Sequence, residues 1–181
     1  MARDERFERI INFVLQWEIV RDRQGNVVAE EDPDDLGGLT KYGIDQAAHP
    51  NVDIRNLTEE GAKEIYYRDY YLGSGADKFP DGIADIVFDI SVNNGKGHAI
   101  KILQEAVGAT VDGVLGPETI HRVNAAPREQ IIMDMLSARE QLYRNIAANR
   151  PASQKFLGGW LNRNNALREF VTGSQDQTQM A

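Results

Sequence analysis

Residues 6–18 read RFERIINFVLQWE, and their apolar positions recur at the spacing of an α-helix. Phe7, Ile11 and Val14 share one face of that helix, and Glu18 falls on the same face at its C-terminal end. Partial burial and the negative end of the helix dipole both oppose ionisation of a carboxyl group in such a place. A carboxylic acid that keeps its proton can act as a general acid. The alternative is that Glu18 ends an amphipathic helix and extends into solvent.

The segment after this helix carries further polar groups. Residues 32–44 read DPDDLGGLTKYGI, and the glycine pair allows a tight turn and close approach of the backbone to a ligand. A hairpin leaving the helix would bring Asp35 and Thr40 over Glu18, so that two carboxylates and a hydroxyl surround one cleft. Glycoside hydrolysis uses such a pair of acidic groups. The alternative is a loop of Asx turns, which suits the neighbouring aspartates better than Asp35.

Composition excludes several classes of function. The 181-residue chain has a net charge of −8, three scattered histidines and no cysteine. Negative charge disfavours binding to nucleic acid or to anionic surfaces, but it leaves neutral sugars open. Without cysteine there is no disulfide or thiolate chemistry, and the histidines lack the spacing of a zinc site. We expect no metal and no cofactor, because acid–base groups suffice.

No apolar run approaches the roughly 20 residues that a membrane-spanning helix needs. The first residues lead into an amphipathic helix rather than a secretory signal. The sequence therefore predicts a protein that is made in the cytoplasm, with no membrane span.

The rest of the chain is predicted to be mainly helical. A short strand is expected at residues 27–29, within a small hairpin. Thr58 is the expected N-cap of the next helix. Further helices are expected at 83–92 and 100–107, from residues 117 and 127 onward, and at 160–171. With no internal repeat and no long linker, we predict one domain over residues 1–172 and a disordered polar tail over 173–181.

The ordered set of motifs resembles glycoside hydrolase family 108, the lysozyme-like N-acetylmuramidases of phages, prophages and bacteria. Its first part is Glu18 followed by the D-P-x-D-x-G-G-x-T-x-Y-G-I pattern of residues 32–44. The resemblance covers about residues 5 to 170, and its later parts lie at residues 88–95, 102–104, 112–119 and 159–163. The second half of the chain is similar to the region named a predicted peptidoglycan-binding domain in this family.

This resemblance implies a mainly α, lysozyme-like fold with a small β-hairpin over the active-site cleft. It divides the domain into a catalytic region, 5–80, and a helical region, 81–172. The implied activity is hydrolysis of the bond between N-acetylmuramic acid and N-acetylglucosamine, with peptidoglycan glycan strands as partner and a monomer as the working form. The protein would reach the cell wall through a phage holin, as an endolysin does, or through a dedicated secretion route.

The resemblance also assigns roles to individual residues. Glu18 is the implied general acid, Asp35 the second acidic group and Thr40 the hydroxyl that positions water. Tyr42 follows the glycine pair and could stack on a sugar face. Asn93 would face the groove and hydrogen-bond an N-acetyl group or backbone, although a C-cap beside Gly95 is an equal alternative.

Two departures from the family pattern leave alternatives open. The family usually has Glu-Gly-Gly at the acid, whereas this chain has Glu18-Ile19-Val20, and residues 21–31 add a hairpin extension. A protein that kept the fold and lost the activity would be a non-catalytic peptidoglycan-binding protein. A lytic transglycosylase would use Glu18 alone and release an anhydro-muramic product.

Three residues of the helical region have structural predictions. Asp89 lies in an apolar helix and needs a partner if it is buried. Arg163 is expected to pair with a carboxylate inside the helical region. Trp160 is expected in the core rather than as a platform for a ligand.

Overall fold

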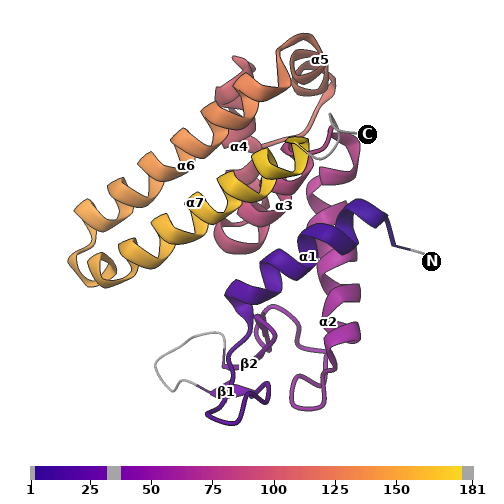
Figure 1. The fold of residues 1–181 in the computed structure, drawn as a ribbon, viewed down its shortest axis with the longest axis vertical. Coiled ribbons are helices and arrows are strands. Elements are labelled where there is room, and N and C mark those ends of the chain that lie inside the picture. Colours follow the sequence, from indigo (N-terminus) through magenta and orange to yellow (C-terminus); the bar gives the residue numbers. More distant parts are fainter. Residues whose placement is uncertain (1–2, 32–37, 177–181) are drawn as a thin grey trace. The chain divides into compact units, whose positions relative to one another are not determined.

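A computed structural model describes residues 3–31 and 38–176, with side chains up to residue 173. The protein is mainly helical with one small antiparallel sheet, which confirms the predicted fold class (Figure 1). The chain forms two compact units, Met1–Asp69 and Tyr70–Ala181. None of the described helices is both long and apolar enough to cross a membrane.

The first unit begins with helix α1 (Glu5–Glu18), as its apolar spacing predicts. The carboxylate of Asp4 caps the helix by accepting a hydrogen bond from the backbone N–H of Arg6, at 2.9 Å. Phe7, Ile11 and Val14 are fully buried, so the face that carries Glu18 at its end is the core face.

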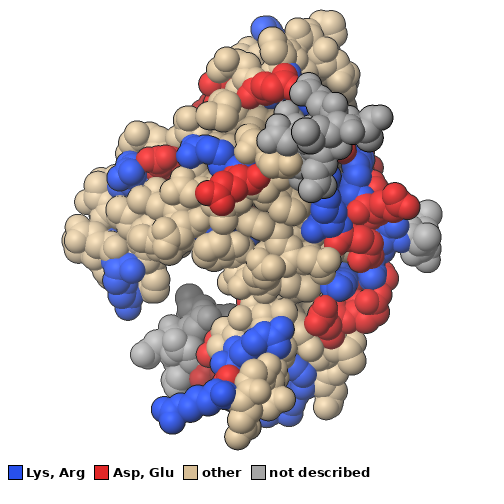
Figure 2. Space-filling model, viewed as in Figure 1, with Lys and Arg blue, Asp and Glu red and all other residues tan. Residues whose placement is uncertain are grey.

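Helix α2 (Glu59–Ile65) starts at the predicted cap, since Thr58 accepts a hydrogen bond from the backbone N–H of Gly61. The chain continues as a π-helical segment, Tyr66–Leu72, in which the boundary between the two units falls. Figure 2 shows basic and acidic side chains interleaved along α2. Among these charges, Arg3 pairs with Glu8 of α1 and with two glutamates of α2, which ties the starts of the two helices together.

The sheet holds three short strands in the order β1-β2-β3, all antiparallel. Strand β1 (Glu30–Glu31) pairs with β2 (Leu39–Lys41), which pairs with β3 (Ile44–Asp45). Thr40 lies at the centre, opposite Glu30 on one side and Asp45 on the other.

The strand predicted at 27–29 is wrong, because this segment forms only one isolated bridge, between Arg21 and Val27. The segment pairs no further with residues 19–21 because the chain joins the ladder with β2 from Glu30 onward. The carboxylate of Asp22 accepts hydrogen bonds from the backbone N–H groups of Gln24 and Asn26, both at 2.9 Å, and so stabilises the tight turn between Arg21 and Val27.

The second unit is a helical bundle in which α3 packs against α4 and α6, and α6 packs against α7. Figure 1 shows α6 and α7 as a long antiparallel pair. Helix α3 is buried from its first residue, Ile83, through Ser91, so it forms the centre of this core. The elements are a 3-10 turn at Ala76–Lys78, α3 (Ile83–Asn94), α4 (Lys96–Val107), α5 (Pro117–Ala125), α6 (Arg128–Asn149), a 3-10 turn at Pro151–Ser153 and α7 (Gln154–Asp176).

Helix α7 starts at Gln154, six residues before the prediction, and runs through Gly158 and Gly159 without interruption. Glycine weakens a helix interior, which is why the pattern placed the start after this pair. The predicted tail, 173–181, begins inside α7, and its residues 177–181 lie outside the described residues.

A buried side chain, Gln104 of α4, organises the loop that leads to α5. Its Nε2 donates to the carboxylate of Asp112 at 2.8 Å and to the hydroxyl of Thr119 at 3.2 Å, while its Oε1 accepts from the backbone N–H of Gly113 at 2.9 Å. The polar residues of this loop therefore stabilise its backbone conformation.

Candidate active site

Glu18 is the last residue of α1, and its side chain is half-buried. The helix ends there because Ile19 adopts an extended backbone, while the N–H of Ile19 still donates to the carbonyl of Leu15 at 2.9 Å. The carboxylate thus stands where the core face of α1 meets the surface. An acid in this position is fixed by a rigid helix and remains accessible to a substrate.

The turn between β2 and β3 lies against Glu18. Tyr42 (φ 55°) and Gly43 (φ 76°) both have left-handed backbones, as a two-residue type I′ hairpin turn requires. Tyr42 is the single non-glycine residue with positive φ among the described residues. A Cβ atom on Gly43 would lie 2.8 Å from Cβ and 3.0 Å from Oε2 of Glu18. Only glycine therefore allows this turn to approach the acid so closely.

Tyr66 holds the same turn from the other side. Its ring is buried, and its hydroxyl donates a hydrogen bond to the backbone carbonyl of Tyr42 at 2.9 Å. The hydroxyl oxygen lies 2.5 Å from the position that a Cβ of Gly43 would occupy. The turn is therefore clamped between Tyr66 and Glu18.

Glu18, Thr40 and Tyr42 line one small pocket together with Glu30, Val20 and Val28. The structure thus brings together three of the five predicted site residues. The hydroxyl of Thr40 donates weakly to the carbonyl of Gly38, at 3.4 Å, and the ammonium of Lys41 lies 5.6 Å from the centre of the Tyr42 ring. One face of that ring therefore has a flexible cation within cation–π distance.

The pocket also contains a carboxylate that sequence reasoning missed. Glu30 lines it and pairs with Thr40 across the β1–β2 ladder. Glu30 and Glu31 directly precede the D-P motif in the sequence. Pairing this segment with the strand around Thr40 in the right register would have predicted that Glu30 lies beside Thr40. Asp35, the predicted second acid, lies outside the described residues.

Asn93, the fifth predicted residue, belongs to the second unit, at the end of α3. Its side-chain oxygen accepts hydrogen bonds from the hydroxyl of Tyr143 at 2.6 Å and from the guanidinium of Arg139 at 3.4 Å. Because arginine can only donate, this contact identifies the amide oxygen.

Behind Asn93 lies a buried ion cluster that confirms two predictions. Asp89 is fully buried and pairs with Arg139 at 2.6 Å and Arg163 at 2.8 Å. Burial by itself would raise the pKa of Asp89, but the charges and hydrogen bonds of Arg163 and Arg139 outweigh it and hold the pKa below its ordinary value. A buried charge held in this way belongs to the core of the second unit.

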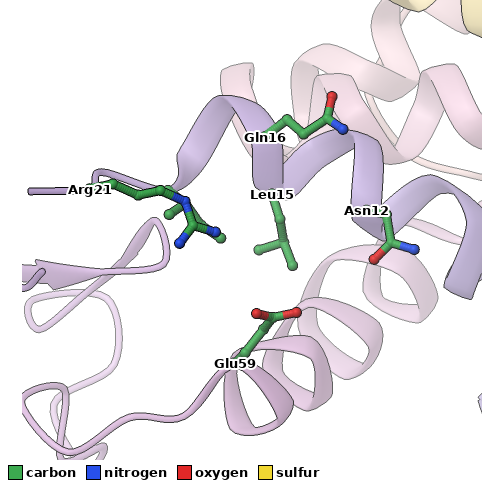
Figure 3. A pocket seen from close by; sticks show the side chains of 6 residues that line it. Asn12, Leu15, Gln16, Arg21 and Glu59 are labelled. Carbon is green, nitrogen blue, oxygen red and sulfur yellow. The ribbon is translucent and has the colours of Figure 1, made fainter. Parts of the chain in front are cut away.

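A second pocket of the first unit lies at the same end of α1 but excludes Glu18 (Figure 3). Leu15 of α1 points toward Glu59 of α2 across it, and Glu59 pairs with Lys63 at 3.2 Å. It is lined by Asn12, Leu15, Gln16, Ile19, Arg21 and Glu59. The described residues contain no group of three or more histidines and acids that could hold a metal ion.

Two protein families match consecutive parts of this chain. Residues 12–95 match the family Glycosyl hydrolase 108, and residues 98–165 match the family Predicted Peptidoglycan domain. The two matches are consecutive, and Glu18, Thr40, Tyr42 and Asn93 all fall within the first. The chain carries a glycosyl hydrolase family 108 region over residues 12–95. It is therefore a glycoside hydrolase, and its second matched region makes peptidoglycan its partner.

The family boundary and the structural boundary of this glycosyl hydrolase differ. The family 108 match ends at residue 95, after α3, whereas the compact units divide at residue 69. Helix α3 thus belongs to the hydrolase family segment in sequence but packs with the helices of the peptidoglycan domain.

A solved structure has the same fold as this glycosyl hydrolase. "Structure of Brucella abortus SagA" aligns with a TM-score of 0.74 at 24% sequence identity, covering 92% of this chain and 94% of that one. No curated protein matches the chain.

Proposed function

We propose that this family 108 hydrolase cleaves the bond between N-acetylmuramic acid and N-acetylglucosamine in peptidoglycan. The observation that carries the proposal is the pocket in which Glu18, half-buried at a helix end, lies together with the hydroxyl of Thr40. An acid that is partly desolvated can protonate the leaving glycosidic oxygen, and a nearby hydroxyl can orient the attacking water.

The second acidic group decides the stereochemical route. We assign this role to Asp35 by its spacing to Thr40 in the family pattern, and Glu30 is the described carboxylate that lines the same pocket. A separation of about 6.5–9.5 Å between the two carboxyl groups leaves room for a water and an inverting reaction, whereas about 5–5.5 Å favours a covalent intermediate.

Mass spectrometry of digested peptidoglycan tests the proposal. Purified sacculi are incubated with the enzyme, and the soluble fragments are analysed for their reducing ends. Cleavage as proposed gives fragments with a reducing N-acetylmuramic acid. Reducing N-acetylglucosamine would assign the other glycosidic bond, anhydro-muramic acid a lytic transglycosylase, and no fragments a non-catalytic binding protein.

We further propose that the enzyme acts outside the cytoplasmic membrane, after release by a phage holin or by a dedicated secretion route. Its partner supports this, because peptidoglycan lies outside that membrane. Expression with and without a co-expressed holin, followed by the turbidity of the culture, tests it. Lysis that depends on the holin identifies an endolysin.

A further inference from the structure

The start of α7 exposes an aromatic side chain above a row of stacked rings. Phe156 is 50% exposed, and its ring centre lies 6.0 Å from that of Trp160, one helical turn later. Trp160 stacks on Tyr143 of α6 at 5.3 Å and 21°, and Tyr143 is fully buried. The three rings therefore form a series from the core to the surface. Trp160 lies in the middle and is half-buried, so it is not purely the core residue that its sequence predicts.

Gly159 lies beside Phe156 on this helix, and neither its backbone conformation nor its neighbours require a glycine there. Its backbone is helical, and a Cβ atom there would meet nothing within 4 Å. Glycine weakens a helix interior, so alanine would be the better residue for the fold alone. A helix surface kept bare beside an exposed ring is suited to a ligand that approaches the backbone closely.

Charge is distributed unevenly around this position. Lys155 and Gly159 are four residues apart and share a face of the helix, and the ammonium of Lys155 lies 4.9 Å from the centre of the Phe156 ring. From Phe156 to Leu167 the only charged residue is Arg163, which is buried. Figure 2 shows the corresponding uncharged surface over this part of α7. The surface thus offers one cation at the edge of a neutral, partly aromatic strip.

From these observations we infer that Lys155, Phe156, Gly159 and Trp160 form a glycan-binding site within the peptidoglycan domain. Neutral sugar rings would pack on Phe156 and over Gly159, and a carboxylate of the peptide carried by muramic acid would meet Lys155. Exposed aromatic rings beside polar groups are suited to ligands with one apolar and one wet face. The inference deepens the peptidoglycan assignment by naming the binding surface, and it holds whichever glycosidic bond the enzyme cleaves.

Co-sedimentation of the full chain with insoluble peptidoglycan sacculi tests the site. The measurements are made on ice in a Glu18→Gln background, so that the sacculi stay intact. Phe156→Ala and Gly159→Ala are each expected to weaken binding by about tenfold or more. Met133→Ala removes another exposed apolar side chain, 43% exposed on α6, and is expected to bind as the parent does.

Gly158→Ala is the matched control for Gly159→Ala. Both glycines are helical and have open space around them, so both alanine variants should raise the melting temperature by similar amounts. Only Gly159→Ala should lose binding, because only position 159 lies beside Phe156. A protein that is stabilised but binds sacculi less cannot be explained by misfolding.

The inference is overturned if Phe156→Ala and Gly159→Ala bind sacculi as the parent does, if the two glycine variants lose binding equally, or if the parent fails to sediment with sacculi. Failure here leaves the cleavage assay unaffected, since that assay reads the reducing end of the product.

Discussion

The hydroxyl of Tyr66 donates a hydrogen bond to the backbone carbonyl of Tyr42 across 2.9 Å, and the two residues are 24 positions apart in the chain. This bond joins the helical segment after α2 to the turn that lies against Glu18. Tyr66 therefore has a positioning role, because it holds the turn beside the proposed acid and takes no part in the reaction itself.

Tyr66→Phe should lower activity while the fold persists. The variant keeps the buried ring and removes the hydroxyl that donates to the Tyr42 carbonyl, an interaction worth about 1 kcal/mol, so kcat should fall by about fivefold with little change in KM. Tyr67→Phe is the control, because it removes a hydroxyl from the adjacent tyrosine, whose ring packs edge-on against Phe7. Equal kcat values for Tyr66→Phe and the wild type would show that the turn does not need this bond.

Gly43→Ala should be far more damaging. The added methyl group would lie 2.5 Å from the Tyr66 hydroxyl and 2.8 Å from Cβ of Glu18, so the turn or the acid must move. A displacement of about 1 Å at a reacting group can cost about 10²-fold in rate. Gly38→Ala carries the same left-handed strain (φ 67°) in open space, and it separates strain from collision. We expect both variants to lose stability in thermal unfolding, and only Gly43→Ala to lose this much activity.

Glu18→Gln tests the general acid directly. The amide keeps the shape of the side chain and removes its proton, so wall lysis should fall by about 10²–10⁴-fold, the usual contribution of general acid catalysis. Glu31→Gln removes an exposed carboxylate of β1 and should lyse sacculi normally. Substantial lysis by purified Glu18→Gln would move the acid to another residue.

The fold was largely predictable from local patterns. Helical spacing, the Thr58 cap and Pro117 at the first position of α5 indicated these helices within a few residues. The misses have local causes as well. One bridge replaced the strand at 27–29 because the chain joins β2 from Glu30 onward, and the glycine pair concealed the first turn and a half of α7.

The candidate site was only partly predictable, because its remaining contacts are long-range. Glu18, Thr40 and Tyr42 carry a recognisable pattern, and the structure places them in one pocket. Glu30 belongs to the site because of the register between β1 and β2, and Tyr66 because of a hydrogen bond between distant segments. Neither residue stands in a local sequence pattern that would predict its place in the site. The close approach of Gly43 to Glu18 likewise follows from how the hairpin lies against α1.

The second acidic group is a choice between two carboxylates. We expect Asp35→Asn to reduce the rate of sacculus lysis by about 10²-fold or more and Glu30→Gln by less than about tenfold, because only Asp35 has the family spacing to Thr40. Asp34→Asn changes the net charge equally and serves as control. The reverse order, with the larger loss at Glu30, would assign the second acidic role to the carboxylate of β1.

Stability in acid should depend on Asp89. Arg163 and Arg139 hold its pKa below the ordinary value despite its burial, so the unfolded chain takes up this proton at a higher pH than the folded one. The stabilisation is therefore fully present above the unfolded value of about 3.9 and is lost as pH falls through the lower folded value. Above that window, Asp89→Asn should cost about 3–5 kcal/mol, since it leaves two buried arginines without their anion.

The test is urea unfolding at a series of pH values, followed by the fluorescence of Trp160 in a Trp17→Phe background, so that the second unit is observed. The gap in free energy of unfolding between Asp89→Asn and its parent should narrow steadily as pH falls below about 4. Asp134→Asn, a change of the same charge at a side chain of α6 that is only partly buried, should track the parent throughout. A gap that stays constant from neutral pH into acid would mean that Asp89 stabilises the bundle by shape and hydrogen bonding rather than by its charge.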